Sequence, residues 1–243
     1  GVWPGVAFWF ARAAAPYYPE ATVTALSCYQ HYNENPLHNN TVPGQFSEWF
    51  DGESLANRGM RLSPWEPPRM LWAAITGMLG IQHPSESCTL HPNVPDRWKW
   101  LAVRRMPHAD GEEALFLARQ NDGQLHLFHG PLHGLATDLP HTGYERDVTQ
   151  SIESLHPDAH VVALAKADEV LICIGSSGLE TATMPLEIHD LLQENTQYRI
   201  VLYDSEFKGW ITGASRPGKD LRRMASSVEP GGFRLFRLTR VRP

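Results

Sequence analysis

The sequence of 243 residues has few cysteines, and they follow no recognisable pattern. Cys28, Cys88 and Cys173 are odd in number and widely separated, and none belongs to a C-x-x-C pair. This usage argues against a disulfide framework and against a cysteine zinc site. We therefore expect buried free thiols in a reducing compartment, which favours a cytoplasmic location.

Basic charge and long apolar runs are also scarce. The chain has 21 Lys and Arg against 27 Asp and Glu, a net charge of -6 at pH 7. Partners such as nucleic acids or anionic membranes call for a basic stripe or a run of Lys and Arg, which this sequence lacks. No apolar run reaches membrane-spanning length either. We expect neither a nucleic-acid partner nor a membrane partner.

The first residues lack the marks of a targeting signal. Gly1-Val2-Trp3-Pro4 includes no initiator Met, no charged region and no signal-type apolar core. The chain instead enters a strongly apolar segment at once. This opening is typical of a piece of a longer protein, and a processed N-terminus would look the same.

Three segments near the start have the apolar spacing of helices. Residues 4–15 are apolar on nearly all sides, with Pro4 suited to the first helical position. Residues 20–33 follow, and a loop rich in Asn, Pro and Gly leads on from them. A third segment begins at Pro67-Pro68 and ends at Gly80. Helices this apolar need neighbours, so we expect further helices around them.

The apolar period changes to two beyond residues 81–95, which have the composition of a linker. Asp122-Gly123 between two such runs predicts a hairpin. Alternating or β-branched runs occupy residues 98–105, 113–119, 124–128, 160–165, 169–174, 198–204 and 233–241. Residues 186–194 fit either a short helix or a loop. We predict an α+β protein with a helical domain (1–85) and an antiparallel β-sandwich domain (86–243).

The stretch from Val42 to Ser54 combines aromatic rings with carboxylates, including Trp49 and Glu48. Rings stack on the C–H faces of sugars, and cleavage of a glycosidic bond uses paired carboxylates. An ordinary loop with buried rings and a turn at Asp51-Gly52 would explain the same residues. The spacing alone does not separate the two interpretations.

Three phrases together resemble the end of an (α/α)6-barrel glycoside hydrolase. They are Trp3-Pro4, the run P-G-Q-F-S-E-W-F-D-G at residues 43–52, and Arg61-Leu62-Ser63-Pro64-Trp65. The resemblance is to bacterial amylo-alpha-1,6-glucosidase-like, or glycogen-debranching-type, proteins of the six-hairpin glycosidase superfamily. Bacterial alpha-L-rhamnosidases carry a similar phrase. The resemblance covers about residues 1–80, and it implies that residues 1–85 are the last helical hairpins of an incomplete toroid.

The resemblance also implies roles for individual residues. The carboxylate that matches Glu48 is the general base of inverting members, which deprotonates the water that attacks the anomeric carbon. The expected substrate-binding residues are Trp3, Trp49, Asp51, Arg61 and Trp65. No cofactor is implied. No segment matches the loop that holds the general acid, so activity on an oligosaccharide is expected to need the remaining N-terminal barrel, from the same parent protein or a separate chain.

Other interpretations remain open. The tryptophans at helix entrances fit core positions, Asp51 fits a turn, and Arg61 fits a loop-holding ion pair. A non-catalytic carbohydrate-binding or subunit-interaction module would also present rings and uncovered helices. His126, His129 and His133 are spaced as if for a metal, but two of them would face opposite sides of a strand. We expect no metal site there.

Overall fold

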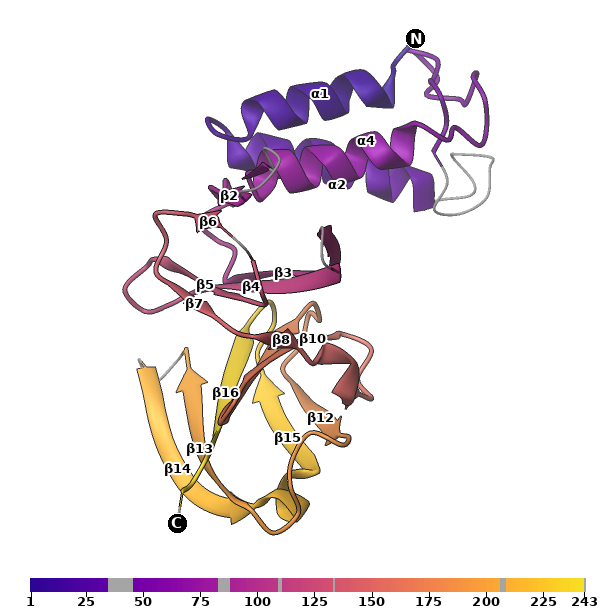
Figure 1. Ribbon diagram of the computed structural model, residues 1–243. Coiled ribbons are helices and arrows are strands. Elements are labelled where there is room, and N and C mark those ends of the chain that lie inside the picture. Colours follow the sequence, from indigo (N-terminus) through magenta and orange to yellow (C-terminus); the bar gives the residue numbers. More distant parts are fainter. Residues whose placement is uncertain (35–45, 83–87, 109–110, 133, 206–208, 243) are drawn as a thin grey trace. The chain divides into compact units, whose positions relative to one another are not determined.

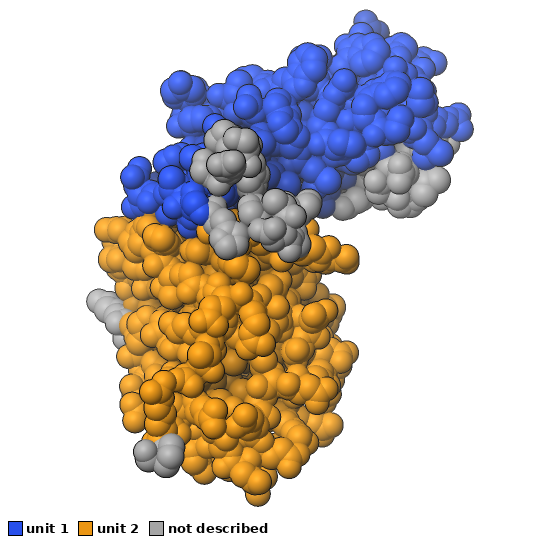
Figure 2. Space-filling view, in the orientation of Figure 1, with its two compact units in different colours: residues 1–96, 133–138 blue, residues 97–132, 139–243 orange. Residues whose placement is uncertain are grey.

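The computed structural model describes residues 1–34, 46–82, 88–108, 111–132, 134–205 and 209–242. The loop predicted after residue 33 lies almost entirely outside these residues, as does His133. The chain divides into two compact units, residues 1–96 with 133–138 and residues 97–132 with 139–243 (Figure 2). The domain assignment made from the sequence stays a prediction.

The first unit is built from helices that lie against one another (Figure 1). They are α1 (Pro4–Ala14), α2 (Pro19–Glu34) and α4 (Glu66–Trp72), which continues as the π-helix η1 (Ala73–Met78). All three predicted helices are confirmed, and Gly80 follows the last of them with φ +61°. The described residues include no closed ring of helices, so the toroid stays a prediction.

The core of the first unit is centred on Phe8 of α1, which is fully buried. Its ring meets Tyr29 of α2 edge to face at 5.4 Å and Phe46 at 5.9 Å. The opposite side of α1 is uncovered: Val6, Trp9 and Phe10 are more than half exposed. The apolar surface expected from the sequence is therefore present, and this unit buries only one side of it.

A small sheet completes the first unit. It consists of β1 (Ile81–Gln82), β2 (Cys88–Leu90) and β6 (Leu135–Ala136). The prediction of a plain linker at residues 81–95 is therefore wrong in part. Strands of two or three residues are too short to show an alternating pattern, so composition alone decided that prediction.

The second unit contains three sheets (Figure 1). The six-stranded sheet has the order β14 (Gly209–Pro217), β13 (Gln197–Asp204), β16 (Phe233–Arg240), β11 (Glu169–Ser176), β10 (Ala159–Lys166) and β8 (Arg146–Asp147). The three-stranded sheet has the order β15 (Arg223–Val228), β12 (Ala182–Ile188) and β9 (Ile152–Ser154). The four-stranded sheet has the order β3 (Trp100–His108), β4 (Gly111–Arg119), β5 (Leu125–His129) and β7 (His141–Gly143). The unit also contains two short 3-10 helices, η2 (Thr149–Ser151) and η3 (Gly218–Leu221).

Alternating side chains of the six-stranded sheet enter two separate cores. In β16, Phe236 and Leu238 pack with the three-stranded sheet, and Phe233 and Leu235 pack with the four-stranded sheet. Both faces of the strand are apolar because both are covered. The predicted α+β class is confirmed, and the sheets are largely antiparallel as predicted, except that β7 pairs parallel with β5 and β6 with β2. The third sheet of the second unit is an addition to the prediction.

The predicted hairpin is also confirmed, because β4 and β5 pair antiparallel around Gly123, which has φ +80°. The prediction of a short helix or a loop at residues 186–194 is wrong for its first three residues, because they are the end of strand β12, which runs to Ile188. All three cysteines are free, but only Cys88 and Cys173 are buried. The expectation of burial is wrong for Cys28, which lies on the exposed side of α2. Within the described residues, no helix is both long and apolar enough to cross a bilayer.

Candidate functional site

Residues 46–63 form a closed loop that leads into α4. Its ends are joined, since Ser63 N donates to Phe46 O at 3.0 Å, and both residues are buried. Val2 exchanges two backbone hydrogen bonds with Phe50, at 2.7 and 2.9 Å. Burial of Phe46 and Phe50 anchors the loop, and Glu48 between them is left partly exposed.

The carboxylate of Glu48 is held in place by the other side of the loop. Glu48 N donates to Met60 O at 2.9 Å, and Met60 N donates to Glu48 Oε2 at 3.0 Å. Among the described residues, no group donates a hydrogen bond to Glu48 Oε1. One oxygen is therefore fixed, and the other is available to a water or a hydroxyl group.

Two tryptophans stack on each other in the same region, and one of them is the residue that follows Glu48. The rings of Trp3 and Trp49 are stacked with centroids 6.1 Å apart and an interplanar angle of 23°. A Cβ on Gly59 would lie 2.5 Å from Trp49 Cδ1 and 2.7 Å from Glu48 Cβ, so the close fit of the loop requires glycine. Trp3 remains 44% exposed. The structure thus brings Trp3, Trp49 and Glu48 together.

Asp51 builds a turn in the same loop. Its Oδ1 accepts hydrogen bonds from Glu53 N at 3.1 Å, Ser54 N at 2.9 Å and Ser54 Oγ at 3.0 Å. The two backbone donors are the main reason that the pKa of Asp51 lies below its usual value. Its Oδ2 lies 4.0 Å from Arg58 Nε. These contacts agree with a turn, and a substrate-binding role for Asp51 stays a prediction.

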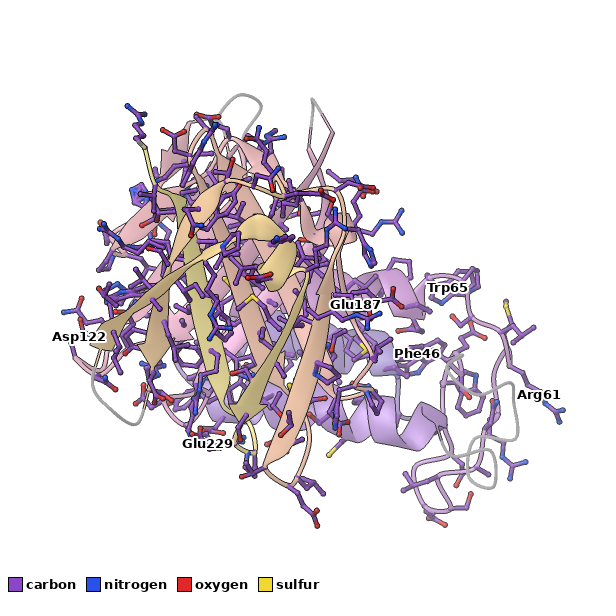
Figure 3. The ribbon with its side chains drawn as sticks, turned by 90° about the horizontal axis from the view of Figure 1, so that it is seen from below. Phe46, Arg61, Trp65, Asp122, Glu187 and Glu229 are labelled. Atoms are coloured by element: carbon purple, nitrogen blue, oxygen red, sulfur yellow. The ribbon has the colours of Figure 1, made fainter. Side chains whose placement is uncertain are left out.

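The two remaining candidates lie where the loop ends. Trp65 immediately precedes α4 and is 39% exposed. Arg61 extends outward from the loop, away from Phe46 and Trp65 (Figure 3). Their roles stay predictions.

Glu66 is a further carboxylate that the sequence analysis did not select. It has no exposed surface, and its Oε1 accepts a hydrogen bond from Arg69 at 2.9 Å. Its Oε2 is buried without a hydrogen bond. Burial raises the pKa of Glu66, Arg69 opposes the rise, and the nearby charge of Glu48 adds to it. The missing side chain of Gly5 in α1 provides the space for the carboxyl group of Glu66, because a Cβ on Gly5 would lie 3.0 Å from Oε2.

Glu66 was missed because its sequence context is ordinary. A glutamate in the first turn of a helix normally faces solvent, and its negative charge interacts favourably with the helix dipole. Nothing in Trp65-Glu66-Pro67 distinguishes a buried carboxyl group from that common case. The site therefore holds two carboxyl groups in different environments, Glu48 fixed and partly exposed, and Glu66 enclosed. Different environments of this kind separate the roles of acidic groups in enzymes.

The burial of Glu66 predicts a pH dependence of stability. Because its folded-state pKa is raised, the folded state binds more protons than the unfolded state between the two pKa values. We expect this contribution to be lost as the pH rises from the ordinary carboxyl range through the folded-state pKa. Chemical unfolding over about pH 4 to 8 should show a smaller decline in Glu66→Gln than in the unsubstituted chain.

The exposed Glu53 supplies the control for this experiment. Glu53→Gln removes a carboxylate from the loop that precedes α4 without opening the core, so it should leave the decline unchanged. An identical pH profile for Glu66→Gln and the unsubstituted chain would show that Glu66 is not the buried titrating group.

His126 and His129 of the second unit contact different groups. His126 Nε2 lies 3.1 Å from Asp122 Oδ2, and buried His129 has Nδ1 at 2.6 Å from Gly130 O. Burial lowers the pKa of His129, whose ring is stacked on His141. Over the described ranges, no group of three or more His, Cys, Asp or Glu side chains is placed to hold a metal ion.

Comparison with known proteins finds only solved structures that match part of this chain. No family model and no curated protein matches the sequence. Solved structures that match include a family 30 endoxylanase from Clostridium papyrosolvens C71 (10% identity, 35% of this chain and 21% of that chain, TM-score 0.27). A family 44 xyloglucanase from Paenibacillus polymyxa with xyloglucan (12%, 34% and 17%, 0.26) also matches.

A third match is a putative alpha-N-acetylgalactosaminidase from Bacillus halodurans C-125 (11% identity, 36% of this chain and 19% of that chain, TM-score 0.27). This chain spans about a fifth of the length of these solved structures. The first two belong to glycoside hydrolase families 30 and 44, and the matched portion covers about a third of this chain in all three cases.

Proposed function

We propose that this chain is the C-terminal part of an inverting glycoside hydrolase that cleaves alpha-glucosidic bonds in oligosaccharides. Glu48 is its general base and deprotonates the attacking water. The observation that carries the proposal is that the Glu48 carboxylate is fixed by Met60 N in the loop whose next residue, Trp49, stacks on Trp3. A base needs a defined position relative to the water, and a sugar ring needs an aromatic face nearby.

The inverting mechanism requires a second carboxyl group, about 6.5–9.5 Å from the first, so that a water fits between base and substrate. Glu66 does not meet this need, because it is enclosed by α1 and α4 and has no surface for a substrate. We place the general acid in a segment outside this sequence, because nothing in the sequence matches the loop that holds it in the family that residues 1–80 resemble. The remaining helices of the toroid, in the same parent protein or in a separate chain, are the proposed source.

Exposed apolar side chains support such a neighbouring segment. Trp9 and Phe10 on α1 and Leu71 and Trp72 on α4 are each at least 40% exposed. Contiguous apolar surface of more than a few hundred Å² is rare on proteins that act alone. Further helices packed on α1 and α4 would cover these side chains.

The stereochemistry of the product tests the proposal. The polypeptide encoded by the full reading frame around these residues should release the β-anomer first from an alpha-linked glucoside, as 1H NMR of the fresh product would show. Initial release of the α-anomer would contradict the inverting mechanism. Absence of hydrolysis over a panel of alpha-linked oligosaccharides would contradict the proposed activity.

A non-catalytic carbohydrate-binding or subunit-interaction module is the second candidate. The exposure of Trp3, Trp9 and Trp65 favours it, because exposed rings bind glycans without any chemistry. Stoichiometric binding of an oligosaccharide that the full polypeptide leaves uncleaved would identify this candidate. Loss of that binding in Trp3→Ala, with Glu48→Gln still binding, would place the rings and not the carboxylate at its centre.

A further inference from the structure

A groove with several arginines lies on the six-stranded sheet of the second unit. Its volume is about 390 Å³. Its lining includes Glu169, Arg199, Thr212, Arg237, Arg240 and Arg242. Four of these are arginines and one is a glutamate, whereas the chain as a whole has a net charge of -6. Positive charge is therefore concentrated at this place.

The strand register puts the key side chains on one face of the sheet. Arg199 of β13 pairs with Thr239 of β16, and Val201 pairs with Arg237. Directly paired residues of antiparallel strands share a face. Arg199 and Arg237 are therefore diagonal neighbours on adjacent strands, and such positions are about 7–8 Å apart. Leu171 of β11, which also pairs with Arg237, belongs to the core under the four-stranded sheet. The groove is thus the open continuation of that covered face.

Arg237 is held in position before any ligand arrives. Its guanidinium lies 4.1 Å from the centroid of the Trp210 ring, and its Nε lies 3.5 Å from Glu169 Oε1. That buried Nε makes no hydrogen bond. A fixed guanidinium loses little conformational entropy when it binds an anion.

The one carboxylate in the groove is already engaged by other groups. Tyr144 donates to Glu169 Oε1 at 3.0 Å, and Thr239 donates to Oε2 at 3.3 Å. Lys166 Nζ lies 3.5 Å from Oε1. Meanwhile Arg199 is exposed and has no hydrogen bond or ion pair in the part of the chain that the structure describes. Arg242 is paired with Asp168, and Lys166 and Arg237 share Glu169, so the excess positive charge of the groove comes chiefly from Arg199.

We propose that this groove binds an oxyanion, either a carboxylate or a phosphate group, between Arg199 and Arg237. Guanidinium groups present paired N–H donors that match the oxygens of both anions. The hydroxyl of Thr212, whose residue pairs with Val201 between the two arginines, adds a neutral donor. This site is separate from the candidate sugar site, and it stands whether or not that site hydrolyses a substrate.

The test is a titration of the whole chain at constant ionic strength, followed by the 1H–15N signals of arginine Nε–H groups. The probes are inorganic phosphate, glucuronate and, as the neutral control, glucose. Phosphate or glucuronate should give saturable shifts, and glucose should give none. The anion that binds more tightly identifies the class of ligand.

Variants locate the binding. Arg199→Gln should weaken binding about tenfold, because it removes one charge-assisted contact from an exposed residue without touching the core. Arg237→Lys keeps the charge but loses the paired donors, and it should weaken binding as well. Arg216→Gln is the matched control: Arg216 is exposed on β14 and pairs with Tyr198, whose side chain belongs to the other face.

Three results would overturn the proposal. The first is the absence of saturable shifts with both anions. The second is equal weakening by Arg216→Gln and Arg199→Gln, which would show general charge attraction. The third is a response to glucose equal to that to glucuronate, which would show that the sugar ring and not the anion is bound.

Discussion

Replacement of Glu48 by Gln should lower the rate of alpha-glucoside hydrolysis by the full polypeptide by a factor of roughly 10²–10⁴, the usual contribution of a general base. Gln preserves the shape of the side chain, and its carbonyl oxygen accepts the hydrogen bond from Met60 N in place of Oε2. The loop therefore keeps its structure, and the loss reports on the missing base. The measurement is kcat on an alpha-linked oligosaccharide.

Substrate binding should be nearly unchanged by this substitution, because the stacked rings of Trp3 and Trp49 are untouched. Glu53→Gln is the matched control, since it removes an exposed carboxylate five positions along the same loop. We expect it to retain the activity of the unsubstituted protein. Full activity in Glu48→Gln, or an equal loss in Glu53→Gln, would remove Glu48 from the role of base.

Local patterns predicted the three helices and several of the longer strands correctly, but not the nine-residue strand β14. Pro4, Pro67 and Gly80 mark real helix ends, and Asp122-Gly123 marks a real hairpin. Each of these signals depends on the backbone preferences of one or two residues, so no distant contact overrides it.

Other strands were missed because their stability comes from distant partners. β12 contains Pro185, and β15 reads Arg-Met-Ala-Ser-Ser-Val, with little β-branching. They are strands because they pair with each other and bury Met184 and Val228 against the six-stranded sheet. Strand propensity depends strongly on such context, and a single sequence does not reveal the neighbours.

The candidate site shows the same limit. The residue types of the loop pointed to Glu48 and to its rings, and the structure places Trp3 beside Trp49 although they are far apart in sequence. The burial of Glu66 was not predictable, because it depends on Gly5 of another helix standing directly over its carboxyl group. Contacts between helices decide that environment, and spacing within one helix contains no information about them.

The second large effect is expected at Gly80, where Ala should destabilise the first unit by about 2–5 kcal/mol. Gly80 has φ +61°, a conformation that costs a residue with a Cβ about 1–2 kcal/mol. A Cβ at this position would also overlap the carbonyl oxygen of His91. Relief of such an overlap typically costs a further 1–3 kcal/mol or so, because the backbone must move.

The backbone near Gly80 has little freedom to move. His91 N donates to Gly80 O at 3.4 Å, Asn93 N donates to Met78 O at 2.6 Å, and Asn93 Nδ2 donates to Gly77 O at 2.9 Å. The two bonds from Asn93 satisfy carbonyl groups at the end of η1, where the helix itself leaves the last carbonyls without donors. A displacement that accommodates Ala would weaken them, so the strain and the lost hydrogen bonds act in the same direction.

Gly231 separates the two causes. It has φ +60°, and a Cβ there would meet no atom within 4 Å. Gly231→Ala should therefore show only the conformational cost, about 1–2 kcal/mol. Chemical unfolding monitored by hydrogen exchange would resolve the stability of each unit. Equal destabilisation by the two substitutions would mean that the chain near His91 yields freely, and that the end of η1 is not fixed by residues 91–93.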